Sequence, residues 1–157
     1  MREVNVLGIM MDPSNGTPVV VLKECDGGRV LPIWIGPMEA LAIQGGLENQ
    51  TPPRPMTHDL MFETIRRLGA MVPTVEITDI KESTFYARIL MDRGGEKIWV
   101  DSRPSDAIAL AVRFGSRIYA GEEVLEKTKT PGTSEEADRW TEVLENLDAQ
   151  AFGKYKV

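Results

Sequence analysis

Short apolar or alternating runs occur in two groups of three, and each group leads into a segment with helical character. Runs of this kind, separated by glycine-containing turns, are typical of β-strands joined by hairpins. The six expected strands are residues 4–11, 19–23, 30–35, 75–80, 85–91 and 97–101. After the second group, apolar residues at 107, 110, 111 and 114 follow the three-and-four spacing of one helix face, so a helix is expected there.

The two groups are related by an offset of 67 residues. Without a gap, residues 17–43 share six identities with residues 84–110, and several further positions match conservatively. Two of the matched residues, Pro37 and Pro104, stand where each helix would begin, a position at which the missing N–H of proline costs nothing. We therefore predict an α+β fold with an internally duplicated strand-strand-strand-helix unit, in mixed or antiparallel sheets with packed helices.

The repeat units span approximately residues 4–48 and 75–116, and a further helix is expected between them. Residues 49–55 are polar and rich in proline, which indicates a loop. Thr57 is a good N-cap for a helix over residues 58–68, and Gly69 is suited to end it. Its expected buried stripe consists of Met61, Ile65 and Leu68.

Residues 1–128 are expected to form one domain, with a short helix near residues 121–127. Residues 129–157 are interpreted as a loop followed by an acidic C-terminal helix. Trp34 and Trp99 both lie in expected strands, so we assign them to the core.

Composition adds limits to this fold. A chain of 157 residues with 42% hydrophobic and 27% charged residues fits one globular domain. No apolar run approaches the roughly 18 residues that a membrane helix needs, and the first residues lack the apolar stretch of a secretory signal. Cys25 is the only cysteine, which excludes an intrachain disulfide and fits a reducing compartment. We expect a cytoplasmic protein that does not enter a membrane.

The formal net charge of −6 disfavours tight nucleic-acid binding, which usually requires a basic surface. Half of this charge lies in residues 131–157, which hold six acids and three bases. The remainder of the chain is close to balanced, so a local basic patch stays compatible with the composition.

Candidate chemistry gathers in three clusters, residues 31–40, 54–60 and 101–107, each at the start of an expected helix. There the backbone N–H groups and the helix dipole favour an anion such as phosphate. The clusters contain carboxylates able to bind Mg²⁺ or Mn²⁺, arginines suited to phosphate, and the sole histidine of the chain. These side chains are Glu39, Arg54, His58, Asp59, Asp101, Arg103 and Asp106.

A structural interpretation of the same residues stands beside the chemical one. Acids in a first helical turn often only complement the helix dipole, and the two arginines are equally able to pair with these acids in a structural network. A P-loop, a dinucleotide-binding glycine motif, a Cys/His zinc spacing and a G-x-S-x-G elbow are all absent from the sequence. The side chains that remain are carboxylates, arginines and one histidine. They are suited to metal-assisted phosphodiester hydrolysis, and equally to a ligand-binding site.

In the three clusters the chain resembles the bifunctional nuclease family of bacteria and plants, whose members cleave both DNA and RNA. The resemblance covers roughly residues 1–127 and includes the stretches 31–36, 54–60, 84–87, 101–110 and 118–125, with Glu39-Ala40 and Arg113. Arg117 stands where the family pattern has a proline, and Asn49 where it has a glycine. Neither departure touches a candidate site residue.

The resemblance implies a nuclease with little sequence selectivity that uses a divalent cation, Mg²⁺ or Mn²⁺, with DNA and RNA as substrates. Within the shared motifs, chemistry assigns a catalytic role to His58, Asp59, Asp101 and Asp106. It assigns phosphate binding to Arg54, Arg103 and Ser105, and metal binding to Glu39, Asp59, Asp101 and Asp106.

A second hypothesis is a non-catalytic regulatory domain that binds a ligand or a partner, and in either case we expect a homo-oligomer. The acidic balance and the absence of a dense carboxylate motif favour this second hypothesis. The two hypotheses differ in whether the four acids converge on one cleft and whether substitution of Asp101 or Asp106 abolishes cleavage.

Overall fold

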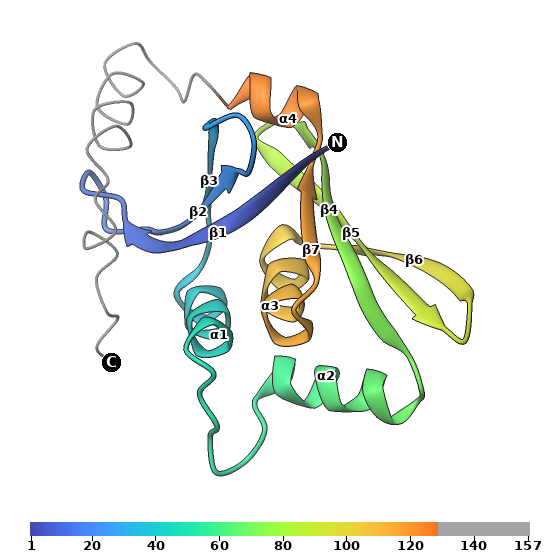
Figure 1. Cartoon of the computed structure of the whole chain (residues 1–157). Coiled ribbons are helices and arrows are strands. Elements are labelled where there is room, and N and C mark those ends of the chain that lie inside the picture. Colours follow the sequence, from blue (N-terminus) through green and yellow to red (C-terminus); the bar gives the residue numbers. More distant parts are fainter. Residues whose placement is uncertain (129–157) are drawn as a thin grey trace.

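The computed structural model of the protein describes residues 1–128 of the chain. The loop and acidic C-terminal helix expected at 129–157 lie outside these residues. Seven strands and four helices follow one another along the described chain (Figure 1). In chain order they are β1 (Arg2–Met11), β2 (Pro18–Glu24), β3 (Val30–Trp34), α1 (Pro37–Leu47), α2 (Thr57–Arg67), β4 (Met71–Lys81), β5 (Thr84–Arg93), β6 (Glu96–Ser102), α3 (Pro104–Phe114), β7 (Arg117–Ala120) and α4 (Glu122–Lys127).

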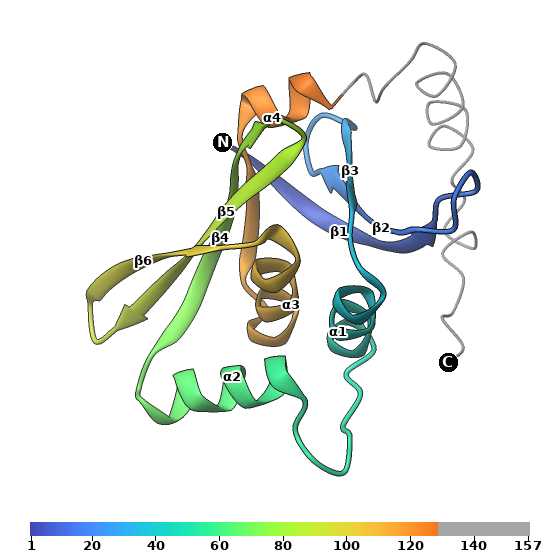
Figure 2. The ribbon, with the colours of Figure 1, turned by 180° about the vertical axis from the view of Figure 1, so that it is seen from behind.

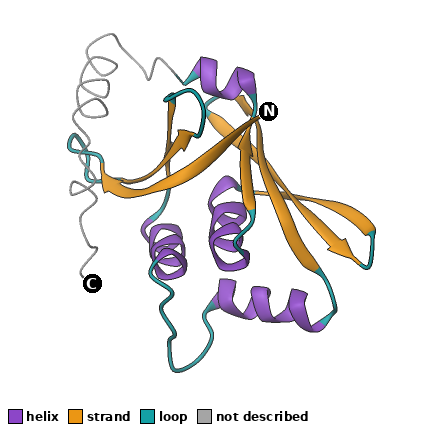
Figure 3. Ribbon diagram, in the orientation of Figure 1, coloured by secondary structure: helices purple, strands orange, loops and turns teal. Residues whose placement is uncertain are grey.

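The predicted strand-strand-strand-helix unit occurs twice, as β1-β2-β3-α1 and β4-β5-β6-α3 (Figure 3). The two helices, residues 37–47 and 104–114, differ by the predicted offset of 67 at both ends. Each has proline at its first helical position, and within each unit consecutive strands pair antiparallel. The α+β class and the duplicated unit are thereby confirmed.

Both units contribute to one mixed sheet of seven strands, in the order β3-β2-β1-β7-β4-β5-β6. The short strand β7 joins the units, because it pairs antiparallel with β1 and parallel with β4. The sequence patterns did not predict β7, whose four residues are too few to show a periodicity. Strands β3 and β6 are left at the two edges of the sheet.

Helices α1 and α3 lie side by side against one face of the curved sheet, and α2 packs across the end of α3 (Figures 1 and 2). Burial of α3 on several sides was not expected from its single apolar stripe. Its neighbours explain the difference: α1, α2 and the sheet surround the helix, and all of residues 107–111 are buried. Each large side chain buried in this core contributes about 1.5–3 kcal/mol.

Three details of the sequence prediction are wrong. Thr57 is the first residue of α2 and Met56 precedes it as the cap; the cap's N–H is bound by Asp59. In the stripe expected on α2 only Ile65 is buried, whereas Leu68 is 67% exposed, because the helix ends at Arg67 and Leu68 follows as its C-cap. Trp99 is 42% exposed, because β6 is an edge strand with only β5 as its neighbour in the sheet.

Within residues 1–128, none of the helices has the length and apolar character needed to cross a membrane.

Candidate active site

A cleft of about 1230 Å³ opens between the first turns of α1, α2 and α3 and the adjoining ends of β5 and β6. Its wall is mainly apolar, with polar and charged side chains gathered at one part. The residues of acidic or basic type that line it are Glu39, His58, Asp59, Asp101, Arg103, Asp106 and Arg113. Side chains from all three sequence clusters therefore converge on one cavity.

The same local geometry places an acid from each helix at the cleft. Glu39, Asp59 and Asp106 each occupy the third helical position, since α1, α2 and α3 begin at residues 37, 57 and 104. Acids there complement the positive end of the helix dipole. Asp59 also caps its own helix, because its Oδ2 accepts a hydrogen bond from the backbone N–H of Met56 at 3.0 Å. The other two acids reach across to neighbouring elements.

Arg103 joins α1 to α3 through these two acids. Its Nε lies 2.7 Å from Asp106 Oδ2 and its Nη2 lies 3.2 Å from Asp106 Oδ1, which is a two-bond contact between guanidinium and carboxylate. Its Nη1 donates to Glu39 Oε1 at 3.1 Å. The bond to Asp106 and, more weakly, that to Glu39 raise the pKa of Arg103. Arg103 therefore holds the two matched acids of the duplicated helices at a fixed separation.

His58 completes this chain of contacts, with Nε2 at 2.9 Å from Asp106 Oδ1. Burial of Asp106 opposes its ionisation, but the hydrogen bonds from Arg103 and His58 outweigh burial and keep the pKa of Asp106 below its ordinary value. An ionised carboxylate only accepts hydrogen bonds, so Nε2 of His58 is the donor. In the neutral imidazole, Nδ1 is then left to accept a proton.

Asp59 belongs to a second, neighbouring pair. Nε of Arg113 lies 2.7 Å from Asp59 Oδ1, and both side chains are largely buried. Burial again opposes ionisation, but the bonds from Arg113 and Met56 lower the pKa of Asp59. Nη1 of Arg113 also donates to the carbonyls of Ala42 and Ala109 at 2.9 and 2.8 Å. This pair therefore ties α2 to both α1 and α3.

The remaining predicted site residues are placed differently. Asp101 is exposed at the end of β6 and lines the cleft. Arg54 is exposed in the loop before α2 and is not among the residues that line the cleft. Ser105 is 7% exposed at the second position of α3 and is also absent from the cleft lining.

The acids do not form a complete metal site by themselves. Within the described residues, no three His, Cys, Asp or Glu side chains are grouped as a metal ion would require. Both oxygens of Asp59 and of Asp106 are bound by protein donors. Mg²⁺, however, is often held by one or two carboxylates together with water and substrate phosphates. A cation in this cleft would therefore need water and substrate phosphate for most of its ligands.

The candidate set derived from the sequence lacked Arg113 and the apolar wall. Arg113 stands seven residues after Asp106, two turns further along α3, so helical spacing alone was a signal that it faces the same side. The apolar wall has no comparable signal, because it comes from separate elements. Its larger members are Met38, Leu41, Met56, Met61, Phe85, Tyr86, Ile89, Met91 and Val100.

Comparison with known proteins identifies the family. The model of the bifunctional nuclease domain matches residues 20–132, which include every candidate site residue. The chain belongs to the bifunctional nuclease domain family. The resemblance inferred from the sequence clusters is thereby confirmed.

Relatives of two kinds share this domain. An uncharacterized protein of Mycobacterium tuberculosis is 39% identical over 164 aligned residues, which cover 97% of this chain and 98% of the relative. Bifunctional nuclease 1 of Arabidopsis thaliana is 32% identical over 61% of this chain, and bifunctional nuclease 1 of Oryza sativa subsp. japonica is 34% identical over 60%. The aligned part makes up 31% and 30% of these plant proteins. The likeness to the named nucleases is thus a likeness in one domain.

Proposed function

We propose that the chain hydrolyses phosphodiester bonds in DNA and RNA with little sequence selectivity, and that the cleft is its active site. The observation that carries the proposal is the continuous chain of contacts Glu39–Arg103–Asp106–His58 inside one cleft. If the acids had a purely structural role, each of them would only need to cap its own helix. Here two of the three acids instead fix an arginine and orient the sole histidine.

In the proposed reaction His58 is the general base. Nδ1 accepts a proton from a water molecule as the water oxygen attacks phosphorus, and ionised Asp106 stabilises the imidazolium that forms. The imidazolium then returns the proton to the ester oxygen as the P–O bond breaks. Arg103 is a positioning residue in this scheme, since its bonds to Asp106 and Glu39 hold the carboxylate against His58.

A divalent cation, Mg²⁺ or Mn²⁺, is part of the proposal as a partner of the substrate. Asp101 or Glu39 would supply a carboxylate oxygen, and the cation would neutralise charge on the phosphate. The charge of the cleft supports this role. Four acids and two arginines line it, so with His58 neutral the lining carries two excess negative charges that repel a phosphodiester.

The alternative, a non-catalytic ligand- or partner-binding domain, is favoured by one observation, the mainly apolar wall of the same cleft. Concave apolar sites with a few converging polar groups are typical of small-molecule binding.

As to location, we propose the cytoplasm; the exposed free thiol of Cys25 is compatible with a reducing compartment.

The deciding experiment compares cleavage of plasmid DNA and of RNA by wild type, His58→Ala and Asp106→Asn, purified side by side. Loss of a general base lowers a rate by roughly 10²–10⁴-fold, so we expect that loss for His58→Ala on both substrates. Asp106→Asn should lose activity in the same direction, because an amide stabilises the imidazolium less well.

Asp26→Asn is the matched control, since Asp26 is exposed in the turn between β2 and β3, away from the cleft. It should cleave as fast as wild type. Cleavage that persists at the wild-type rate in His58→Ala would reject the nuclease proposal and favour the binding domain. Circular dichroism of each variant shows whether the fold is retained.

A further inference from the structure

The two edges of the sheet differ in how well they are protected against pairing with another strand. The β3 edge carries Pro32 at its centre, and proline cannot donate a ladder hydrogen bond. The β6 edge has no proline over its seven residues, and no other described element pairs with it on its outer side. Strand β6 is therefore the open edge of this sheet.

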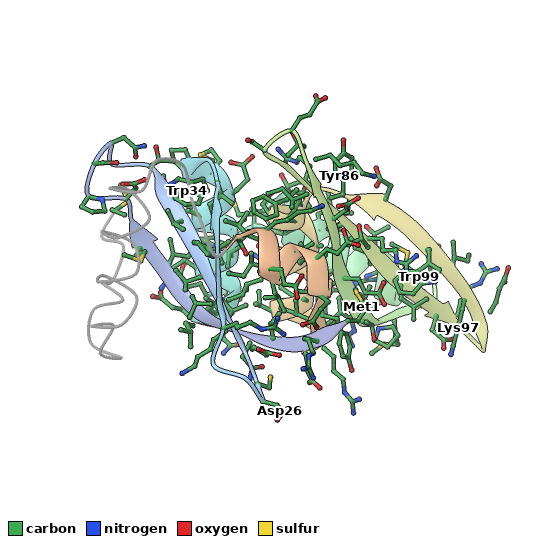
Figure 4. All side chains as sticks on the ribbon, turned by 90° about the horizontal axis from the view of Figure 1, so that it is seen from above. Met1, Asp26, Trp34, Tyr86, Lys97 and Trp99 are labelled. Carbon is green, nitrogen blue, oxygen red and sulfur yellow. The ribbon has the colours of Figure 1, made fainter. Side chains whose placement is uncertain are left out.

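The side chains on this open edge are unusually apolar for exposed positions. Ile98, Trp99 and Val100 are 47%, 42% and 37% exposed, and they follow one another at the centre of the strand. Figure 4 places Trp99 and Lys97 along the outer strand of the sheet. A long, apolar, unpaired edge is a template for another strand, and proteins usually block such an edge or use it.

The sequence of β6, Glu-Lys-Ile-Trp-Val-Asp-Ser, is complementary to itself in one antiparallel register. When two copies are related by a twofold axis perpendicular to the sheet, their β6 strands pair around one central residue. Centring on Trp99 places Ile98 opposite Val100 and Lys97 opposite Asp101, twice each. Centring one residue later places Lys97 opposite Arg103, which are like charges, and centring one residue earlier creates no opposite-charge pair.

The neighbouring strand continues the same charge pattern. Within the chain, Lys97 is in register with Asp92, and Asp101 is in register with Arg88. In the Trp99-centred register, four charged residues lie in line across the two copies. They are Asp92 of β5 and Lys97 of β6 in one copy, followed by Asp101 of β6 and Arg88 of β5 in the second copy. The charges alternate along the whole row, which is the arrangement that stabilises cross-strand neighbours.

We propose that the protein forms a twofold dimer in which β6 pairs antiparallel with β6 of a second copy, centred on Trp99. The two sheets become one continuous sheet, and the apolar centres of both edges are buried together. The occupant of the open edge is thus this chain itself. The open edge, its exposure and its charges favour this dimer whether or not the protein is a nuclease.

The dimer has a consequence for the cleft, and this consequence rests on the proposed function. Val100 and Asp101 both line the cleft, so the interface borders it directly. Lys97 of the second copy is placed opposite Asp101, so a positive charge is added beside a lining that has two excess negative charges. Phosphate approach to the cleft is therefore more favourable in the dimer than in the single chain.

The test uses the full chain and its mass in solution. Sedimentation equilibrium of wild type should give twice the chain mass of 17.5 kDa. The variants Lys97→Glu and Asp101→Lys each turn two attractive cross-strand pairs into repulsive ones. Each should weaken the association roughly tenfold or more, because the twofold axis places each substituted residue in two cross-strand pairs of the dimer.

Mixing the two variants gives the sharpest outcome. In a mixed dimer both pairs join opposite charges again, so an equimolar mixture of Lys97→Glu and Asp101→Lys should regain the dimer mass that neither variant has alone. Recovery also shows that both variants are folded. Lys23→Glu, the same charge change on an exposed position of β2, is the matched control and should remain dimeric.

A wild type of single-chain mass overturns the proposal, as does a Lys97→Glu variant that associates like wild type or a mixture that does not recover. These outcomes are independent of nuclease activity. If cleavage fails while the masses behave as described, the proposed function falls and the dimer stands.

Discussion

At the scale of single residues, the cleft depends on two arginines that pair with three acids. Arg103 binds Glu39 and Asp106, and Arg113 binds Asp59. The two arginines differ in exposure, since the side chain of Arg103 is 66% exposed and that of Arg113 is 11% exposed. Arg113 is therefore mainly a structural partner, whereas Arg103 is open to solvent.

Substitution of Asp59 by asparagine should lower the free energy of unfolding by about 1–3 kcal/mol at neutral pH, because it leaves the largely buried Arg113 without its charge partner. Urea unfolding of wild type and Asp59→Asn measures the difference. Asp26→Asn, on the exposed turn, should change stability by less than about 0.5 kcal/mol. A loss of equal size in both variants would contradict a specific role for the pair.

The stability difference between wild type and Asp59→Asn should also depend on pH. The pKa of Asp59 is lower in the folded chain than its ordinary value of 3.8, because bonds from Arg113 and Met56 outweigh burial. The stabilisation from the ionised carboxylate is therefore fully present above pH 3.8 and is lost as the pH falls through the lower, folded value. The stability difference between wild type and Asp59→Asn should stay constant down to about that pH and shrink below it.

At the scale of elements, the close approach of α1 to α3 determines the geometry of the cleft. The contact is made at Gly46, which is buried in the last turn of α1. A Cβ at this position would collide with Cγ2 of Val112 and lie 2.9 Å from Nη1 of Arg113. Glycine at position 46 thus allows the two helices of the duplicated unit to touch beside the Asp59–Arg113 pair.

Two adjacent glycines give a matched test of this contact. Gly46→Ala should destabilise the fold by about 1–3 kcal/mol through overpacking, although alanine favours helix. Gly45→Ala should stabilise by about 0.5–1 kcal/mol, because its nearest neighbour, Oε1 of Gln50, would lie at an ordinary 3.7 Å. Thermal or urea unfolding of both variants measures the two shifts. Equal shifts of the same sign would show that the helices do not meet at Gly46.

At the scale of the whole molecule, the negative charge of the chain and of the cleft makes substrate binding depend on cations. A fluorescent oligonucleotide with a non-hydrolysable backbone should bind more tightly with Mg²⁺ or Mn²⁺, and EDTA should reverse the gain. Fluorescence anisotropy measures the affinity, and the same ionic strength in KCl is the control for screening. Affinity that is unchanged by EDTA would reject the cation as a partner of the substrate.

The fold was largely accessible from the sequence because its evidence is local. The six longer strands, the turns between them and the two proline-led helices each follow from spacing within about ten residues, and the offset of 67 connected the two units. The short strand β7 and the exposure of Trp99 were missed for the opposite reason. Both depend on which strands become neighbours and which become edges, and a strand's own residues do not specify this.

For the candidate site, the sequence determined the chemical groups, and the tertiary structure decided their partners. Glu39, His58 and Asp106 stood out because polar residues at helix starts are a local pattern. Their joining through Arg103 and Asp106 required α1, α2 and α3 to bring their first turns together. The pairing of Asp59 with Arg113 required the first turn of α2 to lie against the last turn of α3. Contacts across 48 to 64 residues are made by packing of the core, and so only the folded chain determines them.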